Sequence, residues 1–574
     1  TITIMNSTTT KRTPFGMTFY VANTMEIFER LAWYGFFTLS SLYMTSPVAQ
    51  GGLGFSDQER GFLQGMIPFL LYLFPVITGA LADRYGYRKM FILSFIIMTP
   101  CYYLLGQATD FWSFCLVFLG VAIGAACFKP VVVGTVGRVT DDTNRGLGFG
   151  VFYTMVNIGG FLGPLIAGYV RVIGWDMVFV MSSLWIAINF IPAIFLYKEP
   201  TTKSEDQKSL KDVLKEAQQV LGNGRLALFV VPIIVGLMIA AKGAFSFTSL
   251  GIFVLAWTAV NFMWSVANKN KSSNAWHNQP IQLGNVPFVI YLLIMTGFWT
   301  MYLQLFITTP LYIRDFVNTS DLVHYLAQFG QGTLDFLAGV NVEQLTQAIT
   351  TDVEKYGGVA SLPLQEIHFN LVNYKVMVPT DQISQGIQNV FQGTISSAEL
   401  ANQWAQNYRQ VNPEYIINLD FGVIVLFQIF ISHFCSKSKP VPVIILGTIV
   451  IAIGFFIGGI AHGAIMGGVL IATSVIIFAF GEMIASPKSQ EYVAAIAPKE
   501  NTAMYMGYYF VSMALGNLFA GLLSGWAYGY IAKELNSPLL MWSFFAAVGV
   551  VTAIALFIFN KSIVPHWRAQ EAVA

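Results

Sequence analysis

The scarcest feature of this chain of 574 residues is charge, because Lys, Arg, Asp and Glu make up 11% of it while 55% of it is apolar. The mean hydropathy is +0.61, and apolar runs of about 18 residues or more, long enough to cross a bilayer core, recur along the sequence. The net charge of +1 and the lack of a basic run give no basis for nucleic-acid binding. The composition predicts an all-α polytopic membrane protein.

Cysteine is also scarce, with four residues that all lie in or beside apolar segments. This excludes a disulfide framework and a CxxC metal site. The sequence shows no Walker motif, metal-ligand cluster or nucleophile–base arrangement, so we expect neither an enzyme nor an ATP-driven pump, with no cofactor and no metal. The residues NSTTTKRT before the first apolar segment are polar, so we expect no cleavable signal there.

The apolar segments predict two six-helix halves, 1–200 and 286–574, separated by residues 201–285. The intervening region is expected to hold an amphipathic cytoplasmic linker helix at 204–221 and a transmembrane hairpin, which makes fourteen transmembrane helices in all. The expected spans are about 16–45, 60–82, 89–107, 111–136, 146–170, 177–197, 226–241, 244–266, 286–313, 416–434, 441–461, 464–490, 503–530 and 538–560.

Basic residues fall on one side of these helices, and the positive-inside rule identifies that side as the cytoplasm. Both termini are expected on the same, cytoplasmic side. We expect a multi-pass protein of the bacterial inner (plasma) membrane. The opposite side carries an insertion at 315–413 that is rich in Asp and Glu and too long for an ordinary loop. We expect a folded periplasmic domain, which is either a passive lid or a module that binds an envelope protein.

An internal repeat relates the two halves, because two helices in each half share glycine and proline spacing at a constant offset of 357 residues. Small residues at helix crossings let backbones approach closely. Parallel six-helix repeats with a substrate site between them are typical of transporters. The matched pairs are Gly124 and Gly481, Pro130 and Pro487, Gly150 and Gly507, Gly159 and Gly516, and Gly168 and Gly525.

The first apolar segment contains three ionisable residues, Glu26, Glu29 and Arg30, in the stretch EIFERLAWYG. Positions i, i+3 and i+4 share one face of a helix. A charged side chain at the centre of a bilayer costs about 2.5–3.5 kcal/mol on insertion scales, so this face is expected to meet a polar cavity. The alternative is a structural ion cluster that ties helices together.

Several motifs together point to a family. The stretch GALADRYGYRK, Gly79 to Lys89, resembles the signature loop of the major facilitator superfamily. EIFERLAWYG, GAACFKP, FYTMVNIGGFLGP, GEMIASP and MGYYFVSMALGNLFAGLL resemble, in order, motifs of its proton-dependent oligopeptide transporter family. The resemblance covers nearly the whole chain outside 315–413, and it implies the major facilitator fold.

The resemblance also implies roles for individual residues. Glu26, Glu29 and Arg30 would couple transport to protons, together with Lys129 and Glu482 as opposed charges in a central cavity. The substrate would contact Arg30, Lys129 and Glu482 as well as three uncharged residues. These three are Tyr34, Tyr72 and Asn157. Separately, Asp83 and Arg84 would form a cytoplasmic gate.

Two positions depart from the family pattern. Phe37 stands where members usually carry an arginine, and Leu303 stands where their seventh helix usually carries a glutamate. The resemblance implies a proton-coupled symporter for di- or tripeptides or related zwitterions, which moves substrate and protons across the lipid bilayer. Two alternatives stay open: a transporter-derived scaffold or receptor that binds an envelope partner through 315–413, and a carrier of another metabolite without proton coupling.

Overall fold

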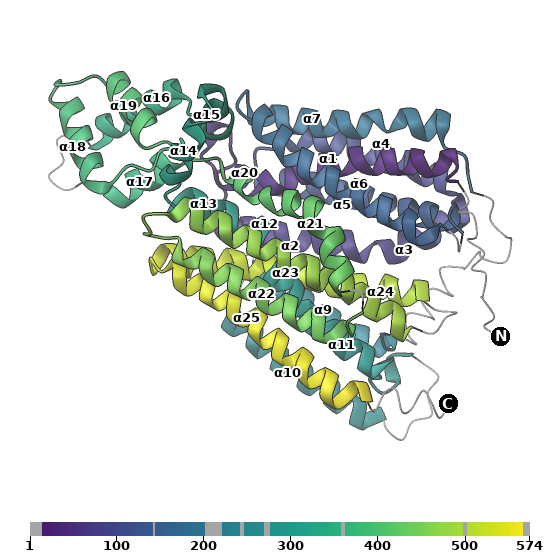
Figure 1. The fold of residues 1–574 in the computed structure, drawn as a ribbon. Coiled ribbons are helices and arrows are strands. Elements are labelled where there is room, and N and C mark those ends of the chain that lie inside the picture. The colour runs from purple at the N-terminus through teal and green to yellow at the C-terminus, as the bar shows by residue number, and fades with distance from the viewer. Residues whose placement is uncertain are drawn as a thin grey trace, which may run out of the picture.

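The computed structural model is a bundle of long helices with a smaller helical cap at one end (Figure 1). Twelve helices of the described residues are long and apolar enough to cross a membrane. Helix α1 (Met17–Thr45) and the shorter apolar helix α9 (Gly224–Ala241) complete the predicted fourteen. The predicted fold class is therefore confirmed. The structure describes residues 14–141, 144–200, 221–241, 246–268, 276–356, 362–435, 437–497 and 502–565.

In the N-terminal half the described residues form six spans, of which the second is broken. Pro75 has no amide hydrogen to donate and stands at the first position of α3, so the span divides there into α2 and α3. A capping box between Ser56 and Glu59 fixes the start of α2. The remaining elements of this half are α2 (Asp57–Leu73), α3 (Pro75–Tyr85), α4 (Tyr87–Leu105), α5 (Phe111–Arg138), α6 (Arg145–Val170) and α7 (Trp175–Ile188).

The described residues of the C-terminal half also form six spans, and the first two are each built from consecutive helices. The hairpin between the halves comprises α9 and α10 (Phe247–Asn268). The predicted linker helix at 204–221 lies almost wholly outside the described residues. The helices of the C-terminal half are α11 (Val286–Tyr302), α12 (Gln304–Ile307), α13 (Thr309–Phe316), α20 (Pro413–Ile417), α21 (Leu419–Cys435), α22 (Pro440–Ile460), α23 (Gly467–Ile496), α24 (Thr502–Trp526) and α25 (Pro538–Ile558).

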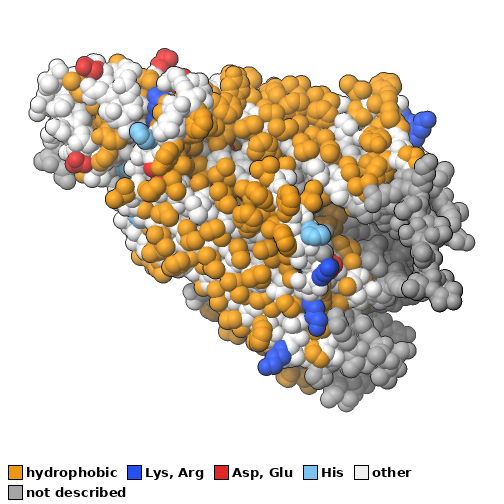
Figure 2. Space-filling model, viewed as in Figure 1, with side chains coloured by type: hydrophobic (Ala, Val, Ile, Leu, Met, Phe, Trp, Pro, Cys, Tyr) orange, Lys and Arg blue, Asp and Glu red, His pale blue; other side chains and the backbone are white. Residues whose placement is uncertain are grey.

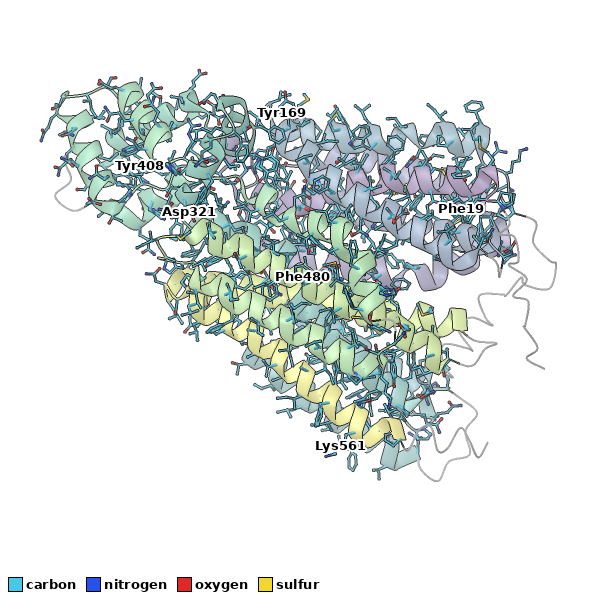
Figure 3. All side chains as sticks on the ribbon, viewed as in Figure 1. Phe19, Tyr169, Asp321, Tyr408, Phe480 and Lys561 are labelled. Carbon is cyan, nitrogen blue, oxygen red and sulfur yellow. The ribbon has the colours of Figure 1, made fainter. Side chains whose placement is uncertain are left out.

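The described residues of the insertion form six helices, and those after residue 341 surround a hydrophobic core of their own that includes Leu345, Ile367 and Trp404. Figure 2 shows acidic side chains on this cap, while Lys and Arg gather toward the other end of the molecule. Asp321, labelled at the base of the cap in Figure 3, accepts hydrogen bonds from two backbone amides at the start of α23. The cap helices are α14 (Ser320–Ala327), α15 (Gln331–Ala338), α16 (Val342–Tyr356), α17 (Leu364–Val372), α18 (Thr380–Phe391) and α19 (Ser397–Asn407).

One pair of the repeated glycines, Gly159 and Gly516, lies where helices cross in the same way in both halves. A Cβ atom on Gly159 of α6 would lie 2.4 Å from Cβ of Arg30 on α1, and one on Gly516 of α24 would lie 2.3 Å from Cβ of Trp299 on α11. Both distances are far below a normal carbon–carbon contact. The repeat in the sequence therefore corresponds to a repeated close approach of backbones.

The two halves are tied together at the cap end of the bundle. Helices α2 and α24 cross at glycines, where a Cβ atom on Gly61 would lie 2.5 Å from the carbonyl oxygen of Gly521. Beside this crossing, buried Arg60 donates hydrogen bonds to the carbonyl oxygen of Ile307 and to the Ser524 hydroxyl. Away from the cap the halves diverge (Figure 1). The molecule is therefore closed on the side that carries the cap.

Exchanging Gly516 for Ala should destabilise the fold, because the added methyl group would overlap Trp299. Overpacking of this kind costs about 1–3 kcal/mol. Gly507 is the matched control on the same helix, since a Cβ atom there meets nothing within 4 Å. Thermal unfolding of the purified protein should give a lower Tm for G516A and an equal or higher Tm for G507A. An equal Tm for the two variants would contradict the close contact of Gly516 with Trp299.

Candidate functional site

Three ionisable side chains of α1 form one buried cluster. Arg30 lies 3.2 Å from Glu26 (Nε to Oε1), and its Nε donates a 2.5 Å hydrogen bond to Glu29 Oε2. Glu26 and Arg30 are each 4% exposed, and Glu29 is fully buried. One oxygen of each carboxylate makes no hydrogen bond among the described residues. One guanidinium group is thus shared by two carboxylates, as the i, i+3, i+4 spacing predicts.

A second cation joins this cluster from α5. Lys129 is half-buried, and its Nζ lies 5.0 Å from the centre of the Tyr72 ring on α2. Lys129 also lies within electrostatic range of Glu26. The guanidinium carbon of Arg30 lies 5.7 Å from the centre of the Tyr34 ring. The structure thus brings both predicted cations and both predicted tyrosines together in the N-terminal half, with each cation over an aromatic ring.

The C-terminal half contributes acidic groups. Glu482 on α23 is 7% exposed and accepts a 2.8 Å hydrogen bond from the Tyr302 hydroxyl on α11. Asp420 on α21 is fully buried, and neither of its carboxylate oxygens has a hydrogen-bond partner in the described part of the chain. Asp420 lies within electrostatic range of both Glu482 and Tyr302. Two carboxylates therefore converge opposite the arginine and the lysine.

Aromatic residues connect the two sets of charges. The Tyr34 ring packs edge-on against Phe421 of α21 with a centroid distance of 5.0 Å, and the Tyr72 ring stacks on Phe510 of α24 at 6.2 Å. Tyr34 also lies within electrostatic range of Glu482. Both tyrosines belong to the N-terminal half and both ring partners to the C-terminal half. The predicted residues therefore meet at the interface of the halves.

Three predicted site residues have local partners in this conformation. Asn157 on α6 is 7% exposed, and its side chain donates a 2.8 Å hydrogen bond to the backbone carbonyl of Tyr153. Lys129 and Glu482, expected as opposed charges, are not within ion-pair distance of each other in the described structure, because Lys129 lies over a tyrosine ring and Glu482 is bonded to Tyr302. Both remain on the same interface.

The structure shows what surrounds Phe37 and Leu303, the two positions that depart from the family pattern. Phe37 is buried and stacks on Trp33 at 5.0 Å, so no charge is accommodated there. Leu303 lies at the break between α11 and α12. A buried acid, Asp420, lies on a different helix, α21. Asp420 is the one formally charged residue in the predicted span 416–434, so the argument applied to Glu26 would also have identified it.

The predicted gate loop joins α3 to α4 through Gly86, which has a φ of +94° that favours glycine. The Glu199 carboxylate accepts hydrogen bonds from the first two backbone amides of α4, at 2.5 and 3.0 Å. The Arg84 side chain is exposed and lies over the neighbouring Tyr85 ring at 5.6 Å. The Asp83 side chain lies outside the described part of the structure, so the gate stays a prediction.

Comparison with known proteins places this architecture in a family. The sequence profile described as "Major Facilitator Superfamily" matches residues 27–338 and 403–572. The chain belongs to the Major Facilitator Superfamily. Residues 339–402, between the two matched regions, fall within the cap and lie outside the match.

Relatives and solved structures give a narrower likeness. A peptide transporter of Yersinia enterocolitica, YePEPT, is 27% identical over 40% of this chain and 47% of its own length. The multidrug resistance protein MdtH of Photorhabdus laumondii is 26% identical over 32% of this chain and 46% of its own length. The chain thus matches about half the length of these relatives. A crystal structure of a POT family transporter in complex with a thioalcohol-conjugated peptide covers 95% of this chain and 96% of its own, with a TM-score of 0.62 at 16% identity. The predicted resemblance is confirmed in superfamily and in fold.

Replacing Arg30 with Leu should destabilise the protein strongly, because Glu26 and Glu29 would lose their shared cation while staying buried. Removing one member of a buried ion pair typically costs about 3–5 kcal/mol. The double variant R30L/E29Q leaves fewer uncompensated charges, so its Tm should lie between those of R30L and the wild type. A double variant that melts below R30L would contradict this account of the cluster.

Proposed function

We propose that this superfamily member is a proton-coupled symporter that imports small zwitterionic solutes, with di- and tripeptides as the leading candidates, by alternating access. The observation that carries the proposal is the separation of charge across the interface of the halves. The N-terminal half presents Arg30 and Lys129, and the C-terminal half presents Asp420 and Glu482. A zwitterion complements both, because its carboxylate faces the cations and its ammonium group faces the acids.

Proton coupling follows from the shared guanidinium of Arg30. While Glu26 and Glu29 are both ionised, they hold Arg30 at 3.2 and 2.5 Å and compete with any substrate carboxylate for it. Protonation of either acid removes one of these competing charges. Arg30 can then bind the substrate anion, so proton binding and substrate binding favour each other. Linkage of this kind is reciprocal.

Asp420 provides the acid that the family pattern would place at Leu303. A buried carboxylate with no hydrogen-bond partner is costly unless it is protonated or binds a cation. Asp420 lies within electrostatic range of Glu482, and like charges at short range do not both ionise readily. In our proposal this pair binds the substrate ammonium group when the site is occupied and retains a proton when it is empty.

One proton per substrate supplies sufficient driving force. Moving one elementary charge through about 100 mV is worth about 2.3 kcal/mol, which supports roughly 50-fold accumulation of a neutral solute. The two relatives compared above carry names with different substrate classes, one for peptides and one for drugs. The cations and acids that meet at the interface of the halves favour a zwitterionic substrate. The alternative of an envelope partner bound through 315–413 stays a prediction.

Replacing Glu29 with Gln should separate coupling from binding. In proteoliposomes with an inward proton gradient, E29Q should lose uphill accumulation of a dipeptide and retain counterflow exchange, because Gln at this position cannot ionise or exchange a proton. The matched control is E366Q, a similar change at an exposed cap residue, which should transport like the wild type. Undiminished uphill accumulation by E29Q would exclude a role in coupling.

Replacing Asp420 with Asn should weaken recognition of the substrate ammonium group. We expect the KM for an unmodified dipeptide to rise about 10–100-fold, in keeping with loss of a charged hydrogen-bond partner worth about 1.5–3 kcal/mol. An N-acetylated dipeptide has no ammonium group, so the variant should discriminate less against it than the wild type does. Unchanged discrimination would show that Asp420 does not contact this end of the substrate.

A further inference from the structure

A cavity of about 400 Å³ lies between the cap and the N-terminal half, outside the proposed transport site. Its walls come from the end of α1, the loop after α6, α13, and cap residues around Asp335, Lys375 and Arg409. Tyr169, labelled at the junction of bundle and cap in Figure 3, stacks on Phe336 of α15 at 5.8 Å beside it. A volume of this size is typical of small-molecule sites, which occupy about 300–1,000 Å³.

Two of the cations that line this cavity already have carboxylate partners. Arg171 lies 3.0 Å from buried Glu414 (Nε to Oε1). Arg314 donates two hydrogen bonds to the neighbouring Asp315, at 2.6 and 3.0 Å. These arginines are balanced by the protein itself, so they give the cavity its polarity and little net charge.

The other two cations are not balanced in this way. Arg409 Nη1 is buried without a hydrogen-bond partner and lies 3.8 Å from Oδ1 of Asp335, a largely exposed residue. The ammonium group of Lys375 has no carboxylate within ion-pair distance in the described structure, although Glu414 lies within electrostatic range. The cavity therefore carries more positive charge than its own acids neutralise.

Lys375 has a strained backbone conformation. Its φ is +63°, a left-handed conformation that glycine adopts more easily than lysine. The position is fixed by its own N–H, which donates to Val372, and by its carbonyl oxygen, which accepts from Gln410 at 2.9 Å. Strained residues held by their surroundings cluster at functional sites. Burial also lowers the pKa of Lys375 to about 7, with the Arg171 charge adding to the effect and Glu414 opposing it.

We propose that this cavity binds a small solute or headgroup through one singly charged anionic group, a carboxylate or a phosphodiester, held by Lys375 and Arg409. An anion would complete the hydrogen bonding of Arg409 Nη1 and neutralise Lys375. A single negative charge suffices, because the other two cations already have partners. This site is separate from the transport site, and it does not depend on the proposed symport.

Anion binding here should take up a proton. A bound anion favours the protonated lysine, so affinity rises as the pH falls through about 7. Between pH 8 and pH 6 the protonated fraction of a group with a pKa of about 7 rises from about 10% to about 90%, which predicts roughly tenfold tighter binding. The charged groups that face Lys375 or line the same cavity are Arg171, Glu414, Arg314, Asp335 and Arg409.

The test is calorimetric titration of the purified full-length protein with dimethyl phosphate and with acetate, at pH 6 and pH 8 and constant ionic strength. The wild type should bind about tenfold more tightly at pH 6. K375R should bind at both pH values without this pH dependence, because arginine stays charged. K375G should bind at least tenfold more weakly at pH 6 while its Tm stays equal or rises, since glycine relieves the positive φ.

K355M, a change at an exposed lysine of the same cap, is the matched control and should bind like the wild type. A second arm uses nanodiscs of phosphatidylcholine with or without phosphatidylglycerol. Loss of dimethyl phosphate binding only when phosphatidylglycerol is present would identify a lipid headgroup as the occupant, and unchanged binding would identify a free solute. Absence of binding by the wild type, or K375G binding as tightly and with the same pH dependence as the wild type, would overturn the proposal.

Discussion

The proposed transport site depends on one interaction, the sharing of the Arg30 guanidinium by two carboxylates inside a bundle of apolar helices. In such a setting an ion pair is strong because little water screens it, and it is costly because each ion has lost its hydration. Glu26 and Glu29 share the single positive charge of Arg30, so neither carboxylate has that charge to itself. Small changes in protonation or in ligand occupancy can therefore redistribute the partners of Arg30, which a fully paired cluster would resist.

Glycines make this cluster compatible with a closed bundle. Arg30 and Gly159 face each other across the crossing of α1 and α6, so the charged residue occupies space that a larger side chain on α6 would fill. The equivalent crossing in the other half places Trp299 against Gly516. The same backbone geometry therefore supports a charged group in one half and an aromatic group in the other, which gives the two repeats different chemistry on a common frame.

The sequence predicts side-chain positions well where all the residues concerned lie on one helix. The spacing of Glu26, Glu29 and Arg30 predicted one face, and the structure places their side chains together. The breaks within long spans, such as the one before Pro75, were less visible, because a proline can either kink a helix or divide it. Contacts between distant segments, such as Arg60 with Ile307, could not be predicted, since they depend on how the halves dock.

Asp420 shows why position along the chain is a weaker guide than convergence in space. The resemblance predicts an acid on the seventh helix, where Leu303 stands, as a partner for the substrate cation. A carboxylate acts through its distance to other charges, and α21 packs against α23 closely enough to bring Asp420 within electrostatic range of Glu482. This half thus brings two acids together from two helices, α21 and α23. A substitution that removes a charge at one position should accordingly be weighed against every buried charge that the fold brings to the same interface.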